Sequence, residues 1–556
     1  MLALLLLALT AVPENGLPID GTFLDPQVME ITRTHDPAFR PTGPLATKKS
    51  AHEVGDRVNF WASDETGTFP EFYLLPATCR YVGEETYVFV EDAMWGTHFD
   101  QPDVAQLAEA LEDSTPSGSG GIVETEAGII GDIPDEIDGD PRVYFLVLDI
   151  RDGFDSTVTE PQVYIAGYFS PYNMFTEEEA WQYYGGHSNE CEMLYLDCYP
   201  SDSYDAVYTA SHELVHLIQW GVQPFAGEEL WVTENEAQTG TFVCGYPAFQ
   251  VETFLDAGGV TPINWTSFPD DLRFVAGYGA GYLFFAYLYE NYGGEDFIYN
   301  SIHNDPGGVA GVEDAIEAAT GTRPDLPDLL EDWMLANFID DTSVGDGRWG
   351  YQNLSLADYD TGSQGNRAGM DYTAVIEGLP FEDSEVEMDG YSGLYYRLPQ
   401  TGTGSFRAST SGLGRLRPYL YDEEAKTVQP LSAGVGGDVA VDLSGGGTVL
   451  LLDGAFAPLT ANVAAGSVVS AAEQLAVYPV PSFGSLYLQF QSSGEAVGFS
   501  VFNASGAHLE TVDYGLQNAG EITLEYAGAA DLASGVYFYR FTQGGRVRTG
   551  KFAVVR

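Results

Sequence analysis

The feature that most constrains this chain is the string Ser211-His212-Glu213-Leu214-Val215-His216, an H-E-x-x-H pattern. Apolar residues recur around it at helical spacing and predict a helix over 204–219. In a helix, positions i and i+4 project from one face about one turn apart, so both imidazoles can bind one zinc ion. The pattern therefore predicts a zinc site at His212 and His216, with Glu213 beside the ion as general base.

A later string, Glu229 to Ala237, supplies the third ligand that catalytic zinc requires in addition to a position for water. Glu234 follows His216 by 18 residues and Glu236 follows it by 20. The string resembles the W-x-x-E-G-x-A helix of the gluzincin metallopeptidases, with Asn235 in place of the Gly. This resemblance implies Glu234 as the third ligand. Glu236 is the alternative, because its Asn-Glu-Ala context is similar to the thermolysin branch of the same clan.

Two further helices are predicted downstream, over 275–292 and over 329–341, from apolar and small residues. They resemble the helical lower subdomain of secreted bacterial gluzincins of a broadly hyicolysin-like type, and the resemblance extends over 54–341. It implies a Tyr or His that stabilises the oxyanion, with Tyr278 and Tyr282 as candidates. Packing in the core is the alternative for both side chains.

Short apolar or alternating runs predict strands at 58–61, 86–90, 143–150, 163–169 and 192–197. The run at 143–150 is apolar until its end, which is typical of a strand buried on both faces. Gluzincins place an edge strand ahead of the metal helix. By that resemblance, residues 166–169 are a candidate for pairing with an extended peptide, and an ordinary hairpin strand is the alternative.

The chain of 556 residues is too long for a single core and is expected to be multidomain. We expect an α+β zincin-type catalytic domain with a helical lower subdomain, followed by two all-β sandwich domains. The predicted boundaries are a signal peptide at 1–16, a β-rich region or pro-segment at 17–100, the metallopeptidase domain at 101–375, an accessory sandwich at 376–470, and a C-terminal sandwich at 471–556.

The C-terminal region carries several motifs in order: Val477 to Pro481, Val501 to Gly506, Leu532 to Arg540, and Lys551 to Arg556. They resemble the C-terminal sorting domain of type IX secretion substrates, although Tyr-Pro-Val-Pro departs from the commoner Y-P-N-P. The resemblance implies the type IX machinery as a partner and a secreted or cell-surface location. A carbohydrate-binding module is the alternative.

Export is also indicated at the other end, where residues 2–12 are almost all Leu and Ala. This run suits the apolar region of a secretory signal, without its basic start, and is too short to span a membrane. No later run is long enough for a membrane span. The 83 acidic against 22 basic residues give a net charge of −61, which excludes nucleic acid and anionic lipid as partners.

The even count of four cysteines, in an exported chain, predicts disulfides, at least one of which braces the catalytic region. They are Cys79, Cys191, Cys198 and Cys244. The acidic run 135–141 has the oxygen density of a calcium loop but lacks EF-hand spacing. A solvated turn is favoured there, and Ca²⁺ is kept as a candidate second cofactor.

Together these features predict a secreted zinc endopeptidase that acts on protein or peptide substrates, with Glu213 as its base. In thermolysin-like relatives an acid four residues after the Glu ligand orients one histidine; this chain has Gln238 there, whose amide can still accept the ring N–H. One alternative is a non-catalytic surface adhesin on a peptidase-like fold, against which the intact Glu213 argues. Another is a zinc hydrolase of a non-peptide substrate, because the metal chemistry does not name the bond.

Overall fold

One mixed sheet holds all the strands that the structure describes before residue 200. The computed structural model describes residues 16–22, 51–67, 71–159, 162–222, 228–257, 260–263, 272–304, 307–359, 369–399, 404–433, 439–455, 457–466, 475–482, 484–492, 494–504, 506–518, 520–544 and 546–556. The order of strands across the sheet is β1 (Gly16–Asp20), β6 (Gln162–Phe169), β7 (Met193–Asp197), β5 (Val143–Leu148), β4 (Thr86–Glu91), β3 (Glu71–Val82) and β2 (Arg57–Asp64).

The sheet is built around β5, every residue of which is buried, as its continuous apolar sequence predicts. Strand β5 pairs in parallel with both β4 and β7, whereas β6 runs antiparallel to β7. The five strands predicted from sequence correspond to β2, β4, β5, β6 and β7, although the predictions at 143–150 and 192–197 extend one or two residues beyond β5 and β7. Because β4 pairs directly with β5, the domain boundary predicted at residue 100 falls inside one continuous sheet.

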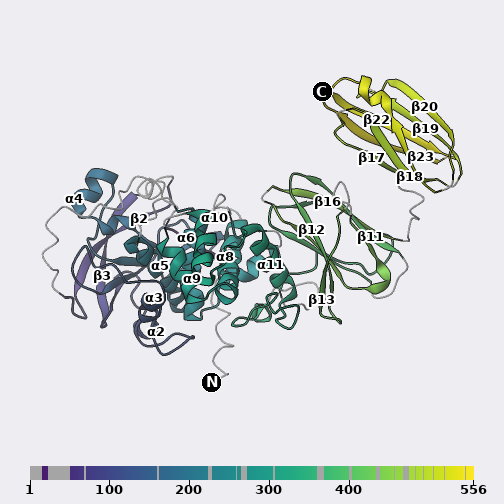
Figure 1. Ribbon diagram of the computed structural model, residues 1–556. Coiled ribbons are helices and arrows are strands. Elements are labelled where there is room, and N and C mark those ends of the chain that lie inside the picture. Colours follow the sequence, from purple (N-terminus) through teal and green to yellow (C-terminus); the bar gives the residue numbers. More distant parts are fainter. Residues whose placement is uncertain are drawn as a thin grey trace.

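Helices cover the sheet and extend away from it toward the next part of the chain (Figure 1). They are α2 (Gln101–Glu112), α3 (Ile122–Ile129), α4 (Glu177–Glu179), α5 (Ser203–Val222), α6 (Leu230–Cys244), α7 (Gln250–Ala257), α8 (Leu272–Asn291), α9 (Glu295–His303), α10 (Gly308–Thr320) and α11 (Leu326–Ile339). The three helices predicted at 204–219, 275–292 and 329–341 correspond to α5, α8 and α11. Helix α5 starts where Asp202 Oδ1 accepts the N–H groups of Tyr204 and Asp205.

A β-sandwich follows the helices and packs directly against α11. Its larger sheet has the order β13-β12-β15-β10-β8, and the smaller one has the order β14-β11-β16-β9. The rings of Phe338 on α11 and Tyr395 on β10 stack with centroids 4.4 Å apart. The strands are β8 (Ala374–Val375), β9 (Phe381–Met388), β10 (Gly393–Arg397), β11 (Ser405–Gly412), β12 (Leu416–Asp422), β13 (Thr427–Pro430), β14 (Val439–Asp442), β15 (Thr448–Asp453) and β16 (Leu459–Gly466).

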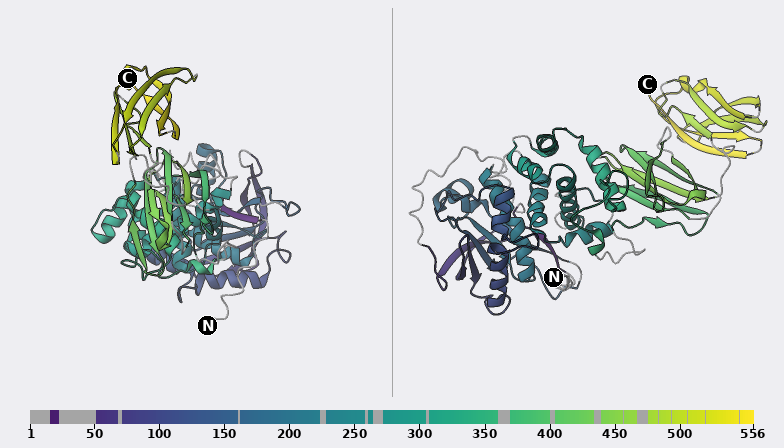
Figure 2. Two further views of the ribbon diagram at one scale, coloured as in Figure 1. Left: turned by 90° about the vertical axis from the view of Figure 1, so that its right-hand side faces the viewer. Right: turned by 60° about the horizontal axis from the view of Figure 1, so that its bottom comes forward.

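The last body is a second β-sandwich, which Figure 2 shows apart from the first one. Its hydrophobic core is separate and includes Phe499, Phe541 and Phe552. A three-stranded sheet, β17-β18-β21, faces a four-stranded sheet, β20-β19-β22-β23. The prediction of a multidomain chain with two β-sandwiches is thus confirmed. The strands are β17 (Leu475–Tyr478), β18 (Leu486–Ser492), β19 (Ala496–Phe502), β20 (His508–Leu516), β21 (Gly520–Tyr526), β22 (Gly535–Gln543) and β23 (Arg546–Val554).

The structure shows none of the predicted disulfides: all four cysteines are buried, and because Cys79, Cys198 and Cys244 are free, no disulfide joins any two of the four. Cys79 lies on β3, Cys191 and Cys198 flank β7, and Cys244 ends α6. Each belongs to the large hydrophobic core that the sheet and the helices share, where a cysteine packs as a small apolar side chain.

Of the expected export signal, residues 1–15 lie outside the described part of the chain. Among the helices that the structure describes, none has both the length and the hydropathy of a membrane span.

Gly167 on β6 allows this strand to lie against α5. A Cβ atom at this position would lie 2.4 Å from Thr209 Cγ2 and 2.6 Å from the carbonyl oxygen of Tyr195. We therefore expect Gly167→Ala to lower the free energy of unfolding by about 1–3 kcal/mol, because it overpacks the contact. Thermal unfolding measures the loss. Gly128→Ala, at an exposed position of α3 with nothing within 4 Å, is the control and should not destabilise the protein. Equal midpoints for both variants would contradict the packing argument.

Candidate metal centre

Helix α5 presents His212 and His216 on one face, with ring centroids 5.0 Å apart. Both are buried, with 4% and 0% of their surface exposed. Other residues of α5, such as Leu214 and Leu217, pack into the same core as the sheet. The helix is therefore fixed on the sheet by its apolar residues while the two imidazoles face a polar interior site.

Helix α6 brings Glu234 to the two histidines. The distance from Glu234 Oε2 to His212 Nε2 is 3.5 Å, and the carboxylate is buried. Gly240 makes this approach possible, because a Cβ there would lie 2.4 Å from the carbonyl oxygen of Ser211 on α5. The structure thus places His212, His216 and Glu234 together, as the sequence predicts.

The rival ligand, Glu236, points away from the histidine pair. Its Oε2 accepts a hydrogen bond from Gln219 Nε2 at 2.8 Å, and its Oε1 accepts one from Ser301 at 2.5 Å. Gln219 in turn places Oε1 2.8 Å from His216 Nδ1. The group that orients His216 is therefore Gln219, which Glu236 holds in place. Gln238, expected from sequence in this role, instead accepts the hydroxyl proton of Tyr208 at 2.9 Å.

Sequence analysis missed the fourth group, Asp20 on β1. Its Oδ2 lies 3.7 Å from His216 Nε2, and one ligand atom from each of Asp20, His212, His216 and Glu234 lies within 4.8 Å of the others. A lone aspartate some 190 residues before the H-E-x-x-H pattern carries no local signal. Only the position of β1 next to β6 brings it to the site.

These donors fit a zinc ion. A tetrahedral ion with bonds of about 2.0–2.1 Å separates its ligand atoms by about 3.3–3.4 Å, close to the 3.5 and 3.7 Å observed. Asp20 Oδ2, Glu234 Oε2 and His212 Nε2 are buried and have no hydrogen-bond partner. Buried polar atoms without hydrogen bonds are rare, so their convergence on one point indicates a cation.

Burial sets the protonation of the four groups. It lowers the pKa of both His212 and His216 to about 4, so the rings are neutral and able to act as ligands at pH 7. It raises the pKa of Glu234 to about 8. It also raises that of Asp20 to about 6, where the nearby Glu234 charge adds to the effect. A bound cation would reverse these carboxyl shifts by stabilising the ionised forms.

Glu213, the predicted base, is fully buried next to the ligand set. Its Oε2 accepts a hydrogen bond from the Thr22 hydroxyl at 3.2 Å, and its Oε1 has no hydrogen-bond partner. Burial first, and then the charge of Asp20, raise its pKa well above the usual value. A carboxylate with a raised pKa takes up a proton readily, which suits a general base.

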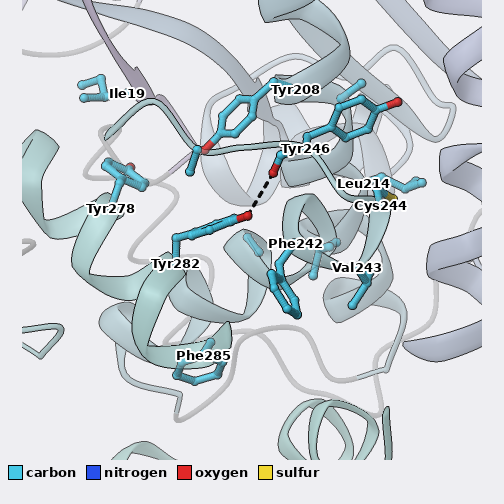
Figure 3. Packing of buried hydrophobic residues seen from close by; sticks show 14 of the residues in the cluster. Ile19, Tyr208, Leu214, Phe242, Val243, Cys244, Tyr246, Tyr278, Tyr282 and Phe285 are labelled. Carbon is cyan, nitrogen blue, oxygen red and sulfur yellow. Dashed lines mark hydrogen bonds between the residues drawn. The ribbon is translucent and has the colours of Figure 1, made fainter. Parts of the chain in front are cut away.

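The two candidate tyrosines differ in position (Figure 3). Tyr278 lies beside His212, with ring centroids 6.1 Å apart, and its hydroxyl also hydrogen-bonds Glu234 and so lowers the pKa of that carboxyl. Tyr282 points toward α6 and α7 and donates its hydroxyl to the carbonyl oxygen of Tyr246 at 3.1 Å. Tyr278 therefore lies in the site, whereas Tyr282 fills the core, so the prediction of a site role for Tyr282 is not supported.

Asn235, which replaces the glycine of the gluzincin motif, is accommodated by a glycine on the facing helix. Its Oδ1 lies 2.0 Å from the place where a Cβ of Gly281 on α8 would be. Its Nδ2 donates to the carbonyl oxygen of Pro262 at 3.0 Å. Asn235 therefore fits between the helices without moving α6 or Glu234 away from the site.

A second acidic group forms around the loop that sequence analysis compares with a calcium loop. Ligand atoms of Asp135, Asp138 and Glu192 lie within 4.8 Å of one another. Glu192 is buried, and its Oε1 accepts the N–H groups of Glu136 and Ile137. The oxygen ligands suit Ca²⁺, and calcium binding here stays a prediction.

Comparison with known proteins identifies the end of the chain first. Residues 476–555 match the family described as Secretion system C-terminal sorting domain. The chain ends in a type IX sorting domain. The sequence-based prediction for the C-terminal sandwich is thus confirmed, and it indicates a secreted or cell-surface location.

The chain is also similar to a curated protein, the neutral metalloprotease ShpI of Staphylococcus hyicus. The two share 27% identity over 280 residues, which cover 47% of this chain and 58% of the relative. The chain therefore matches a little more than half the length of that protein.

Two solved β-glucuronidases also align with 29% of this chain. The Parabacteroides merdae enzyme with glycerol in its active site is covered to 27%, at 11% identity and a TM-score of 0.18. The Faecalibacterium prausnitzii enzyme is covered to 36%, at 13% identity and a TM-score of 0.17. At these TM-scores the alignments give no information about fold or function.

The distinct environments of the two α6 carboxylates predict different metal binding. We expect Glu234→Gln to lose zinc on dialysis against a low zinc concentration, because it removes an anionic ligand. Glu236→Gln is the matched control and should keep one zinc ion per chain. Its zinc affinity should fall by no more than about 10–100-fold, because it disturbs only Gln219, which orients His216. Metal analysis per chain measures both. Retention by Glu234→Gln together with loss from Glu236→Gln would reverse the ligand assignment.

When a chelator removes the metal ion, the folding stability of the protein should depend on pH between 6.5 and 8. Glu234 has a folded pKa of about 8 against 4.5 for the free group. The folded state therefore holds an extra proton, and the associated stability, present below pH 4.5, is lost as the pH rises through 8. His212 and His216 affect stability only at lower pH, between their usual pKa of 6.5 and their folded pKa of about 4, where stability is lost as the pH falls.

We expect the thermal midpoint of the chelated protein to fall from pH 6.5 to pH 8, and the zinc-loaded protein to change less because the cation favours the ionised carboxylates. Chelated Glu234→Gln should show a smaller fall, since the titrating group is gone. Identical pH dependence with and without zinc would contradict this description of the site.

Proposed function

We propose that this chain is a zinc-dependent endopeptidase with a zincin-type catalytic fold, exported by way of its C-terminal sorting domain. The convergence of two neutral imidazoles and a buried glutamate beside a second, catalytic glutamate carries the proposal. The similarity to a neutral metalloprotease supports peptide as the substrate.

His212, His216 and Glu234 would hold the ion. Bound zinc would lower the pKa of water to about 7 and polarise a carbonyl group. Glu213 would accept the proton of the attacking water at Oε1 and then deliver it to the amine that leaves. Its neighbouring position on α5, one residue after His212, keeps its carboxylate next to the ion.

Tyr278 is the residue placed to act on the oxygen of the tetrahedral species. Its hydroxyl hydrogen-bonds the Glu234 carboxyl and accepts the N–H of Asp20 at 3.3 Å, so it lies at the edge of the ligand set. A hydroxyl donor at that point would stabilise developing negative charge.

Digestion of casein by zinc-loaded protein, in a form with the site accessible, separates the peptidase from both alternatives, the adhesin and the non-peptide hydrolase. We expect Glu213→Gln to lower the rate by about 10²–10⁴-fold, because it removes the base. Its zinc content should not change. Glu178→Gln, the same substitution at an exposed site, is the control and should keep full activity. Chelation should abolish digestion, and added zinc should restore it.

Proteolysis that survives Glu213→Gln would exclude the mechanism. A protein that binds zinc stoichiometrically but digests neither casein nor gelatin, in any form with the site accessible, would favour one of the two alternatives.

A further inference from the structure

Strand β1 lies where sequence analysis expects an extended substrate to bind. It pairs in parallel with β6, with Ile19 opposite Ile165 and Asp20 opposite Gly167. The pairing continues past the strand end, where the N–H of Gly21 donates to the carbonyl oxygen of Gly167 at 2.9 Å. The main-chain groups that β6 would offer to a peptide are therefore bonded to a segment of the same chain.

The side chains of this segment reach both halves of the catalytic machinery. Asp20 joins the ligand set, with Oδ2 3.7 Å from His216 Nε2, and only 7% of the residue is exposed. Two residues on, the Thr22 hydroxyl donates to Glu213 at 3.2 Å and accepts the N–H of Phe169 at 2.9 Å. One short segment thus contacts the proposed metal position, the base and the substrate strand together.

Little space remains for a substrate. The cavity at His212 and Glu213 has a volume of about 20 Å³, and Ile19 and Asp20 form part of its wall. A cavity of roughly this size holds about one water molecule. A peptide can reach the ligand set only if β1 moves away.

We propose that residues 16–22 are an internal, substrate-like inhibitor of the metal centre, with Asp20 as the fourth metal ligand, so that the intact chain is latent until this segment leaves β6. The inference rests on the proposed zinc peptidase function. Because the ligand oxygen comes from the Asp20 side chain, no backbone carbonyl of the segment occupies the position of a scissile peptide bond. The segment therefore binds at the site without being cleaved. Thr22 at the same time occupies one oxygen of the base.

The place of β1 in the sheet explains how it can leave. It is the outermost strand, paired only with β6 among the described strands, whereas β6 remains paired with β7 after β1 departs. Removal would therefore expose an edge and leave the rest of the sheet hydrogen-bonded. The other three ligands come from α5 and α6, which do not depend on β1 for their own backbone hydrogen bonds.

The test compares the full-length, zinc-loaded protein with Asp20→Ala and with Asp132→Ala, the same change at an exposed aspartate. The probe is a fluorescein-labelled leucyl-glycyl hydroxamate, which binds zinc and is not hydrolysed. We expect Asp20→Ala to bind it at least about tenfold more tightly than wild type, because the competing ligand is gone and the open state is populated. Zinc content should stay at one per chain. Asp132→Ala should match wild type.

A second arm supplies the segment from outside. The peptide Gly-Leu-Pro-Ile-Asp-Gly-Thr, which repeats residues 16–22, should displace the hydroxamate from Asp20→Ala. The same peptide with Asn in place of Asp should displace it at least about tenfold less well, because the anionic ligand is missing.

Equal hydroxamate affinity in wild type and Asp20→Ala would overturn the proposal, and so would loss of zinc from Asp20→Ala, which would make Asp20 a permanent ligand. Both results leave the peptidase function standing if zinc-loaded wild type digests casein. Failure of wild type to bind zinc at all would instead reject the proposed function, and the inference with it.

Discussion

The burial of several carboxyl groups next to one another is the constraint on which the candidate metal centre depends. Asp20, Glu213 and Glu234 lie buried together beside two neutral imidazoles, and nothing but a cation or protons can offset their mutual repulsion. The sheet, α5 and α6 hold these groups in place because their apolar faces form a core much larger than the site. Packing elsewhere therefore supports a centre that would be unfavourable by itself.

Close approach between helices is what makes the centre compact. Gly240 brings α6 against α5, and Gly281 leaves room on α8 for Asn235. The gluzincin motif uses glycine on the ligand helix, whereas here the small residue stands on the opposite helix. The missing side chain of Gly281 thus provides the space that Asn235 occupies between α6 and α8.

The sequence predicts what depends on local pattern and misses what depends on topology. Periodicity was sufficient for α5, α8 and β5, and spacing within α5 was sufficient for the histidine pair. Glu234 could be preferred over Glu236 only through a resemblance, because two residues on one helix cannot be told apart without the position of α5. The sequence does not predict the roles of Asp20 and Gln219. Asp20 reaches the site through the pairing of β1 with β6, and Gln219 acts through a side-chain contact with His216, and neither follows from residue spacing. For Tyr282 the sequence leaves a site role and core packing both open, because the small residues around it are compatible with either; its hydrogen bond to the Tyr246 carbonyl oxygen favours packing.

The free cysteines Cys79, Cys198 and Cys244 have a consequence for where this protein can fold. Burial raises the pKa of the Cys79 thiol to about 11 and that of Cys198 and Cys244 further, so little reactive thiolate forms at neutral pH. The core around these thiols therefore forms without an oxidant. A chain of this kind can reach its native state under reducing as well as oxidising conditions, which makes production of the folded protein independent of the redox compartment.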